Sequence, residues 1–201
     1  MKKEPLEAGY YYHIFNRGNN KENIFKEEIN YFYFLQLVKK HLIPVCNIYA
    51  YCLLPNHFHI LLKIKETEYL PDLYRLRKSK IHQPFSNLFN AYSKAVNKKY
   101  SRTGSLFQEH LHRVKINSKE YFKQLILYIH LNPEKHGLTE DYSKYKHSSY
   151  QSYVINAYAN WLARSEVINC FVDQDNFIYC HQQKKLKIKL LQEIEEMEER
   201  T

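Results

Sequence analysis

The segment from residue 45 to residue 64, VCNIYAYCLLPNHFHILLKI, restricts the fold more than any other part of the chain. Two apolar runs flank Pro55-Asn56, and this pattern predicts a β-hairpin with a tight turn. Side chains two residues apart in a strand point to the same side, so the second strand has two unlike faces. One face carries Phe58, Ile60, Leu62 and Ile64, and the other carries His57, His59, Leu61 and Lys63. We expect helices to cover the wholly apolar face and to leave the histidines on the more open one.

The chain on either side of the hairpin predicts further strands and helices. The expected strands are 10–16 and 105–116, and the expected helices are 27–42, 86–100 and 118–131. The last helix begins at an Asn117 cap with Glu120 at the capping-box position, and it must end before Pro133. This order is typical of a ferredoxin-like α+β fold, an antiparallel sheet with helices packed on one face.

The length of 201 residues suits one folded domain with an extension. We expect the domain to cover residues 1–153 and a helical accessory tail to cover 154–201. Within the tail, a small helical part is expected at about 160–183. An amphipathic helix over 184–199 follows, either as a frayed terminus or as a surface for association, so a monomer and a homodimer both remain open.

Positive charge is concentrated in one part of the chain, whose formal net charge is +9. Between Arg75 and Lys123, Lys and Arg residues are opposed only by Glu109 and Glu120. Such a basic segment favours a polyanionic partner, most often a nucleic acid, although a solvated surface is the alternative. The chain also has 19 Tyr, whose rings can stack on unpaired bases or simply pack in strands.

The four cysteines form no CxxC pair, which argues against a zinc ribbon or a disulfide framework. No signal peptide is recognisable, and no apolar run approaches the roughly 20 residues that span a bilayer. These features predict a protein of the reducing cytoplasm.

His57 and His59 predict chemistry because two imidazoles on one strand face can chelate a divalent cation. A third ligand is then required, and the helix expected at 118–131 offers candidates. Its apolar stripe consists of Phe122, Leu125, Ile126 and Ile129, and its flank carries Tyr121, Gln124, Tyr128 and Asn132. If the stripe packs on the sheet, Tyr128 could be a nucleophile and Asn132 an oxygen ligand. Core histidines, a boundary tyrosine and a capping asparagine remain the alternative at this point.

Four segments, in order, resemble a known family. They are YHIFNRGNNKENIF (12–25), YCLLPNHFHILLK (51–63), RTGSLFQEH (102–110) and YIHLNPEKHGL (128–138). His57-Phe58-His59 fits the HUH motif of single-strand DNA endonucleases. Together the segments resemble the REP-associated tyrosine transposases, which are single-tyrosine HUH transposases. The resemblance covers roughly residues 8–153, and 161–183 looks like the accessory tail of some members.

This resemblance implies the HUH endonuclease fold and a mechanism. Mg²⁺ or Mn²⁺, held by His57, His59 and Asn132, would polarise the scissile phosphate. Tyr128 would attack that phosphate, giving a 5′-phosphotyrosine link and a free 3′-OH that allow rejoining. The family therefore implies a transposase whose four catalytic residues are all present in this chain.

The implied substrate is single-stranded DNA with an imperfect, REP-like hairpin, acted on in the cytoplasm at the nucleoid. Candidate phosphate contacts are Arg17, Arg102, Arg113 and Lys115. One departure is Glu109-His110 after LFQ, where relatives usually have a small residue and then a basic one, so affinity or site preference could differ. Two other functions remain open: a domesticated hairpin-binding protein that no longer cleaves, and an HUH replication initiator.

Overall fold

A four-stranded antiparallel sheet lies at the centre of the computed structural model, which describes residues 5–76, 81–109, 111–155, 160–183 and 194. Its strands are β1 (Tyr11–Arg17), β2 (Cys46–Leu54), β3 (His57–Ile64) and β4 (His112–Ile116), in the order β2-β3-β1-β4. The predicted hairpin of β2 and β3 is confirmed, and its two strands pair from Cys46 opposite Ile64 to Leu54 opposite His57.

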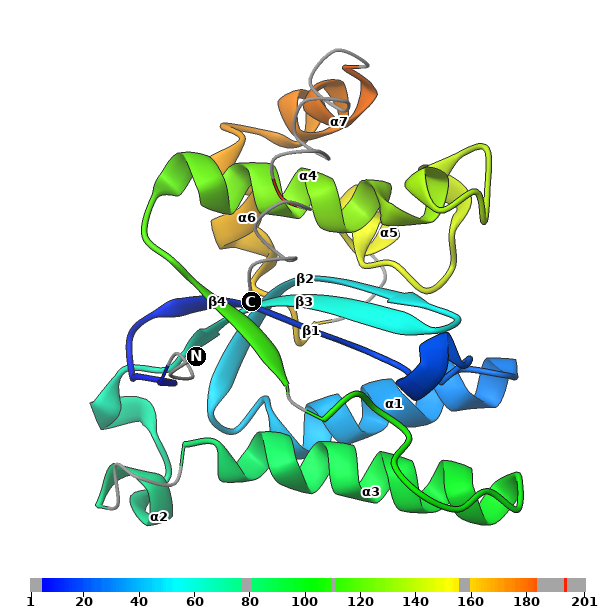
Figure 1. The fold of residues 1–201 in the computed structure, drawn as a ribbon. Helices are drawn as coiled ribbons and strands as arrows, with labels where there is room; N and C mark the ends of the chain where they lie inside the picture. Colours follow the sequence, from blue (N-terminus) through cyan, green and yellow to red (C-terminus); the bar gives the residue numbers. More distant parts are fainter. Residues whose placement is uncertain (1–4, 77–80, 110, 156–159, 184–193, 195–201) are drawn as a thin grey trace.

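Three long helices surround the sheet: α1 (Glu28–His41), α3 (Gln83–Lys99) and α4 (Lys119–Lys135) (Figure 1). The short helices are η1 (Asn19–Lys21), η2 (Thr67–Tyr69), α2 (Asp72–Arg75), η4 (Tyr142–Lys144), α5 (Tyr150–Val154), α6 (Arg164–Cys170) and α7 (Gln174–Gln182). The predicted α+β class with an antiparallel sheet is confirmed. No helix in the described part of the chain is long and apolar enough to cross a membrane.

The helices cover both faces of the sheet, so the expectation that they pack on one face is wrong. The Phe58 ring lies 5.2 Å from Phe34 of α1 and 5.6 Å from Phe89 of α3. The next residue, His59, points to the opposite face and lies 5.5 Å from Tyr128 of α4. Figure 1 shows α4 on one side of the sheet and α1 with α3 on the other. The histidine face needs this cover because the strands beside β3 also place apolar and aromatic side chains on it.

The layer of α1 and α3 is held by a cluster of aromatic rings. Phe34 is fully buried, with Phe25 at 5.3 Å and Tyr92 at 5.1 Å between ring centroids. The Tyr92 hydroxyl donates to the Ile24 carbonyl over 2.7 Å, so its polar end is satisfied inside the core. This packing fixes the Phe58 side of β3 and therefore the direction in which its histidines point.

Helix α4 differs from its predicted bounds at both ends. Ser118, and not Asn117, is the N-cap, and its hydroxyl accepts from the Tyr121 amide over 3.1 Å. The helix also continues through Pro133 to Lys135. Proline costs the helix one hydrogen bond, but later amides still bond backward, with His136 donating to the Asn132 carbonyl over 3.0 Å. The last turn is therefore retained, and Asn132 stays helical.

The described part of the accessory region packs against α4 and the edge strand β2 (Figure 1). The Ala163 amide donates to the Ile48 carbonyl over 2.9 Å, and Val167, Phe171 and Phe177 are fully buried. The expected small helical part corresponds to α6 and α7. The amphipathic helix expected over 184–199 lies outside the described residues apart from Ile194, and the division at residue 153 stays a prediction.

Candidate active site

The two histidines of β3 lie beneath α4 and are buried. His57 is 6% exposed and His59 is 3% exposed, so the expected open face is closed by the helix. Their rings are nearly perpendicular, with centroids 5.3 Å apart. The alternation of the strand therefore places both imidazoles on one face, as the sequence predicts, but in the interior.

Each histidine has a hydrogen-bond partner on its Nδ1 atom. His57 Nδ1 lies 2.6 Å from Asn56 Oδ1, which can only accept, so this nitrogen carries the proton. His57 Nε2 then bears the lone pair, and this buried atom has no hydrogen-bond partner in the described structure. His59 Nδ1 lies 3.1 Å from Nε2 of His13, a fully buried residue of β1. Partners of this kind orient the ring and leave Nε2 to face a ligand.

The surroundings keep both imidazoles neutral. Burial lowers the pKa of His57 far below its ordinary value, and the neighbouring His59 and His136 add to the effect. Burial likewise lowers the pKa of His59, with Lys135 and His136 as further causes. A neutral imidazole is the form that binds a metal ion, because the lone pair must be available.

Tyr128 and Asn132 lie one turn apart on α4. Tyr128 is 1% exposed, and its ring centroid is 5.5 Å from that of His59 and 6.2 Å from that of His13. Lys135 places its Nζ atom 5.0 Å from the centre of the Tyr128 ring. The Asn132 amide nitrogen donates to the Tyr128 carbonyl over 2.9 Å, while its buried Oδ1 has no hydrogen-bond partner among the described residues.

The donor set fits a divalent cation. Two buried acceptor atoms, His57 Nε2 and Asn132 Oδ1, are without hydrogen bonds in the described structure, and each costs about 1–3 kcal/mol if it stays unsatisfied. Imidazole nitrogens and an amide oxygen are suitable ligands for first-row divalent ions and for Mg²⁺ or Mn²⁺. Within the described ranges, no group of three His, Cys, Asp or Glu side chains could hold a metal ion. A site here therefore depends on the asparagine.

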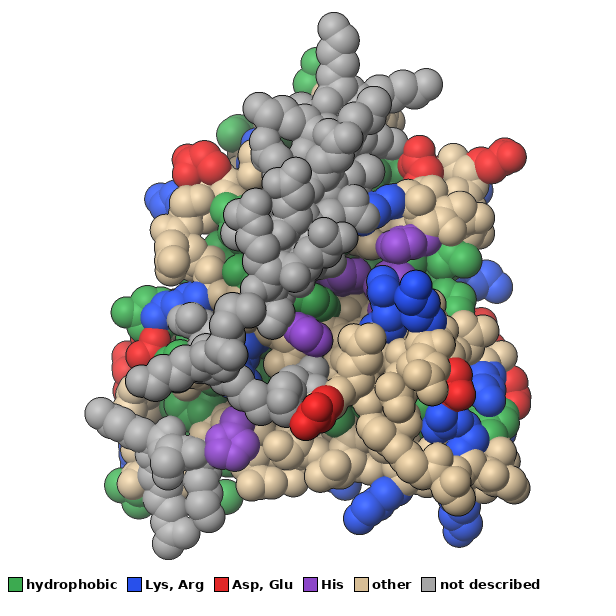
Figure 2. Space-filling model, viewed as in Figure 1, with side chains coloured by type: hydrophobic (Ala, Val, Ile, Leu, Met, Phe, Trp, Pro, Cys, Tyr) green, Lys and Arg blue, Asp and Glu red, His purple; other side chains and the backbone are tan. Residues whose placement is uncertain are grey.

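A cavity of about 270 Å³ opens beside these residues. Its lining consists of Phe15, Asn16, Arg17, His57, Phe58, His59, Gln108, His112, Tyr128, Lys135 and His136. The structure thus brings His57, His59, Tyr128 and Arg17 together at one cavity. Asn132, one helical turn from Tyr128, is fully buried and does not line this cavity. Figure 2 shows histidine side chains beside a group of Lys and Arg side chains between the layer of α4 and the opposite layer.

Sequence reasoning missed three residues of this site: His13, Lys135 and His136. His13 lies on the same face of β1 as the histidines of β3, and strand alternation within YYHIF would have found it had the β1–β3 pairing been known. His136 lies just past the end of α4, with its ring 4.6 Å from that of His57. Lys135 is in the final turn of α4, beyond the end that the sequence predicts before Pro133.

The predicted phosphate-binding residues have different settings. Arg17 lines the cavity. Arg102 pairs with Glu22 over 2.5 Å, and Lys115 pairs with Glu7 and lies over the Tyr10 ring at 3.4 Å from its centroid. Arg113 lines a second cavity. The positive segment is therefore spread over several surfaces rather than gathered at the histidines.

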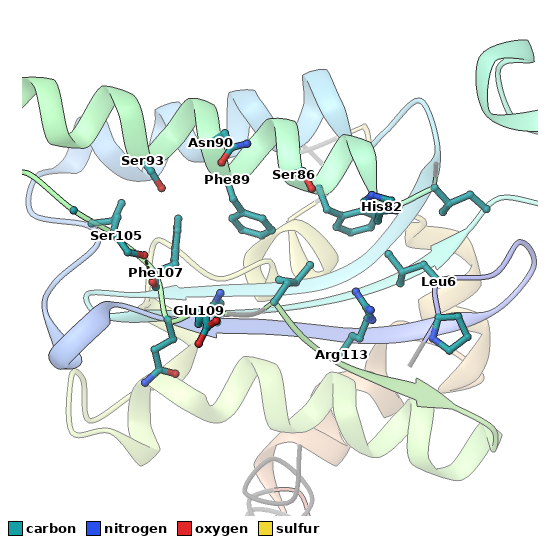
Figure 3. A pocket seen from close by; sticks show the side chains of 18 residues that line it. Leu6, His82, Ser86, Phe89, Asn90, Ser93, Ser105, Phe107, Glu109 and Arg113 are labelled. Carbon is teal, nitrogen blue, oxygen red and sulfur yellow. Dashed lines mark hydrogen bonds between the residues drawn. The ribbon is translucent and has the colours of Figure 1, made fainter. Parts of the chain in front are cut away.

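This second cavity, of about 700 Å³, is lined by α3, by residues 104–109, and by Asn16 of β1 and Arg113 of the edge strand β4. Figure 3 shows Phe89 pointing from α3 toward the sheet, with Ser86, Asn90 and Ser93 on the same helix and Arg113 opposite. Asn16 and Gln108 line both cavities, so the two adjoin. Glu109, the first of the two residues that depart from the family pattern, also lines this cavity. The second, His110, lies outside the described residues. Aromatic walls with a polar rim suit a flat, hydrogen-bonding ligand.

No protein-family model matches the chain. Among solved structures, a REP-associated tyrosine transposase bound to a REP hairpin superposes with a TM-score of 0.58. The match has 15% sequence identity and covers 81% of this chain and 90% of that one. The fold is that of a tyrosine transposase.

A protein of Haemophilus influenzae that carries the name REP-associated tyrosine transposase is 32% identical over 107 residues. That match covers 50% of this chain and 57% of the relative, so the chain spans just over half of the relative's length. The family resemblance found in the sequence is thereby confirmed as a resemblance in both sequence and fold.

Proposed function

We propose that the protein is a single-strand DNA endonuclease and strand transferase that cuts beside a DNA hairpin through Tyr128. The observation that carries this proposal is the perpendicular contact of the Tyr128 ring with His59, at the wall of a cavity that also holds Arg17 and Lys135. The relative's name and the hairpin bound to the structural neighbour support the same activity. The reaction would take place in the cytoplasm, at the nucleoid.

His57, His59 and Asn132 would hold a divalent ion, Mg²⁺ or Mn²⁺. When bound, such an ion acts as a Lewis acid on a non-bridging oxygen of the scissile phosphate. The protein's own contribution is to keep both imidazoles neutral and oriented, through burial and through the hydrogen bonds that His57 Nδ1 and His59 Nδ1 make to Asn56 and His13.

Tyr128 would act as the nucleophile. Its phenolic oxygen forms a new P–O bond while the bond from phosphorus to the 3′ oxygen breaks. The phenolic proton passes to water, and the leaving 3′ oxygen takes up a proton from water. The products are a 5′-phosphotyrosine and a free 3′-OH, and the reverse reaction with another 3′-OH rejoins the strand. Lys135, whose Nζ lies 5.0 Å from the centre of the Tyr128 ring, would offer positive charge to the phosphate that Tyr128 attacks.

The two adjoining cavities define a path for single-stranded DNA. Arg17 would contact the phosphate beside the reacting group, and Arg113 a phosphate in the larger cavity. Unpaired bases can stack on aromatic rings there, as on Phe89, and hydrogen-bond to its amides and hydroxyls. Arg102 and Lys115 would meet DNA only if it displaces their carboxylate partners.

The test uses the full chain with single-stranded hairpin oligonucleotides carrying unpaired flanks, in Mn²⁺, followed by denaturing gel electrophoresis. We expect a covalent protein–DNA adduct that is absent in Tyr128→Phe and present in Tyr121→Phe, a control on the same helix. His57→Ala and His59→Ala should lose cleavage and keep hairpin binding. Hairpin binding without any adduct would instead favour the domesticated binding protein, and cleavage by Tyr128→Phe at the normal rate would refute the role of Tyr128.

A further inference from the structure

A chain of buried hydrogen bonds runs through α4 on the side away from the candidate active site. His130 of α4 places Nδ1 2.9 Å from His181 Nε2 on α7 and Nε2 2.8 Å from the Ser149 hydroxyl. Beyond these, His181 Nδ1 lies 2.7 Å from the Phe177 carbonyl, and the Tyr51 amide lies 2.9 Å from the Ser149 oxygen. His130, His181 and Ser149 are all fully buried.

With both imidazoles neutral, the Phe177 carbonyl at one end fixes the proton positions along this chain. The Phe177 carbonyl can only accept, so His181 donates from Nδ1 and must accept at Nε2. His130 therefore donates from Nδ1 and accepts at Nε2 from the Ser149 hydroxyl over 2.8 Å, which is shorter than the 3.2 Å from that hydroxyl to the Tyr51 carbonyl. The Ser149 oxygen in turn accepts from the Tyr51 amide. Every member is satisfied with both imidazoles neutral, in agreement with the lowering of the His130 pKa by burial. A fully satisfied buried network of this kind specifies one arrangement of its elements.

The network joins three elements of the fold, α4, α7 and β2. It links the accessory helix α7 to α4 and, through Ser149, to the backbone of the edge strand β2. Apolar packing between α4 and the sheet is non-directional, whereas hydrogen bonds fix rotation and translation. Pro133 has no amide to bond to the Ile129 carbonyl, so α4 is weakened in the segment that carries Tyr128 and depends more on outside contacts.

His130 and Tyr128 are two residues apart, which is about 200° around the helix. Tyr128 therefore points to the histidines of β3, while His130 points to the accessory region and the sheet edge. A shift of about 1 Å in a reacting group can cost about 100-fold in rate. A fixed His130 thus controls where the Tyr128 oxygen lies relative to a bound phosphate.

We infer that His130 and His181 are positioning residues through which the accessory helix α7 holds α4, and with it the Tyr128 nucleophile, in place. This inference rests on the proposed function, and it gives the region after residue 160 a role in the chemical step rather than in DNA binding.

The test compares His181→Phe, which removes the acceptor and keeps the bulk, with His181→Gln, whose side-chain oxygen can still accept from His130. The measured quantities are the hairpin dissociation constant and the single-turnover rate of adduct formation, well below the melting temperature of each variant. We expect His181→Phe to bind hairpin within about twofold of the parent and to form adduct at least about tenfold more slowly. His181→Gln should recover most of the rate.

Val167→Ala serves as the matched control because Val167 is equally buried in the accessory region and its side chain takes no part in the hydrogen bonds of the network. It should lower the melting temperature and leave the adduct rate of the folded protein unchanged. A His181→Phe variant that is less stable but cleaves at the parent's rate would show a merely structural role and overturn the inference.

A second readout does not depend on activity. With 3-fluorotyrosine incorporated only at position 128, the fluorine resonance should shift or broaden in His181→Phe and return toward the parent signal in His181→Gln. An unchanged resonance in His181→Phe overturns the inference even if no hairpin is ever cleaved. Loss of the adduct in the parent chain, with the fluorine shift present, would refute the proposed function alone.

Discussion

The Tyr128 ring meets the His59 ring almost at a right angle, 87° between planes and 5.5 Å between centroids. This contact joins α4, the helix after the last strand, to β3, the second strand of the hairpin. It exists because α4 covers the histidine face of the sheet, where Phe122 also packs 5.0 Å from Tyr11. The candidate nucleophile and the candidate ligands are therefore placed by the same packing that forms the core.

His13 should control metal affinity through His59. Replacing it with Phe removes the hydrogen-bond partner of His59 Nδ1 and frees the ring to adopt the wrong tautomer. We expect Mn²⁺ binding to weaken about 10- to 100-fold, measured by titration calorimetry without DNA. His13→Gln keeps a side-chain oxygen as acceptor and should lose less. Equal affinities for the parent and His13→Phe would contradict this role.

The pH dependence of stability follows from the buried histidines. Burial lowers the pKa of His130, as it does those of His57 and His59, below the value of about 6.5 that an unfolded histidine has. The unfolded chain thus binds more protons, so the free energy of unfolding is at its full value above pH 6.5 and falls as the pH drops. The slope approaches about 1.4 kcal/mol per pH unit for each such group. Urea unfolding at pH 7.5, 6.5 and 5.5 measures it, and a flat profile would contradict the neutral assignment.

Arg17 should matter more for DNA than Arg102. Arg17 lines the candidate catalytic cavity, whereas Arg102 is engaged with Glu22. Arg17→Gln should weaken hairpin binding and lower the slope of log K against log salt by about 1, because one phosphate contact is lost. Arg102→Gln is the matched charge removal and should change that slope less. Binding measured across a salt series decides between them, and equal slopes for the two variants would be the contrary result.

The aromatic cluster beneath the sheet should dominate stability. Phe34→Ala leaves a cavity between α1, α3 and β3 and should cost about 3–5 kcal/mol of unfolding free energy. Phe32, on the same helix, is 54% exposed, and Phe32→Ala should stay within about 0.5 kcal/mol. Urea denaturation of the two variants provides the comparison. Similar losses would mean that Phe34 is not a central packing residue.

The hairpin and its two faces could be predicted from the sequence because period-2 alternation is a local property of one strand. The apolar stripe of its helix allowed Tyr128 to border the histidines but left a boundary tyrosine as the alternative, and the family resemblance supplied the expectation. The placement of helices on both faces could not be predicted from the sequence. The apolar side chains of the histidine face come from several strands, and the order of these strands in the sheet depends on long-range pairing. The end of α4 was missed because Pro133 removes a single bond while the surrounding turn keeps its others.

The site was incomplete in the sequence for a similar reason. His13 meets His59 only through the pairing of β1 with β3, a long-range contact. The link between His130 and His181 depends on how α7 packs, and no motif spacing encodes it. Residues that act by orienting other residues, such as His13, are hard to recognise in the sequence. His57 and His59 are easy to recognise because their spacing places them on one face of one strand.

The most direct measurement of the central claim is mass spectrometry of the protein–DNA adduct after protease and nuclease digestion. We expect the peptide containing Tyr128 to carry the 5′-phosphate of the cleaved strand and no such peptide to form in Tyr128→Phe. A nucleotide attached to any other residue, or cleavage that leaves no covalent link, would contradict it.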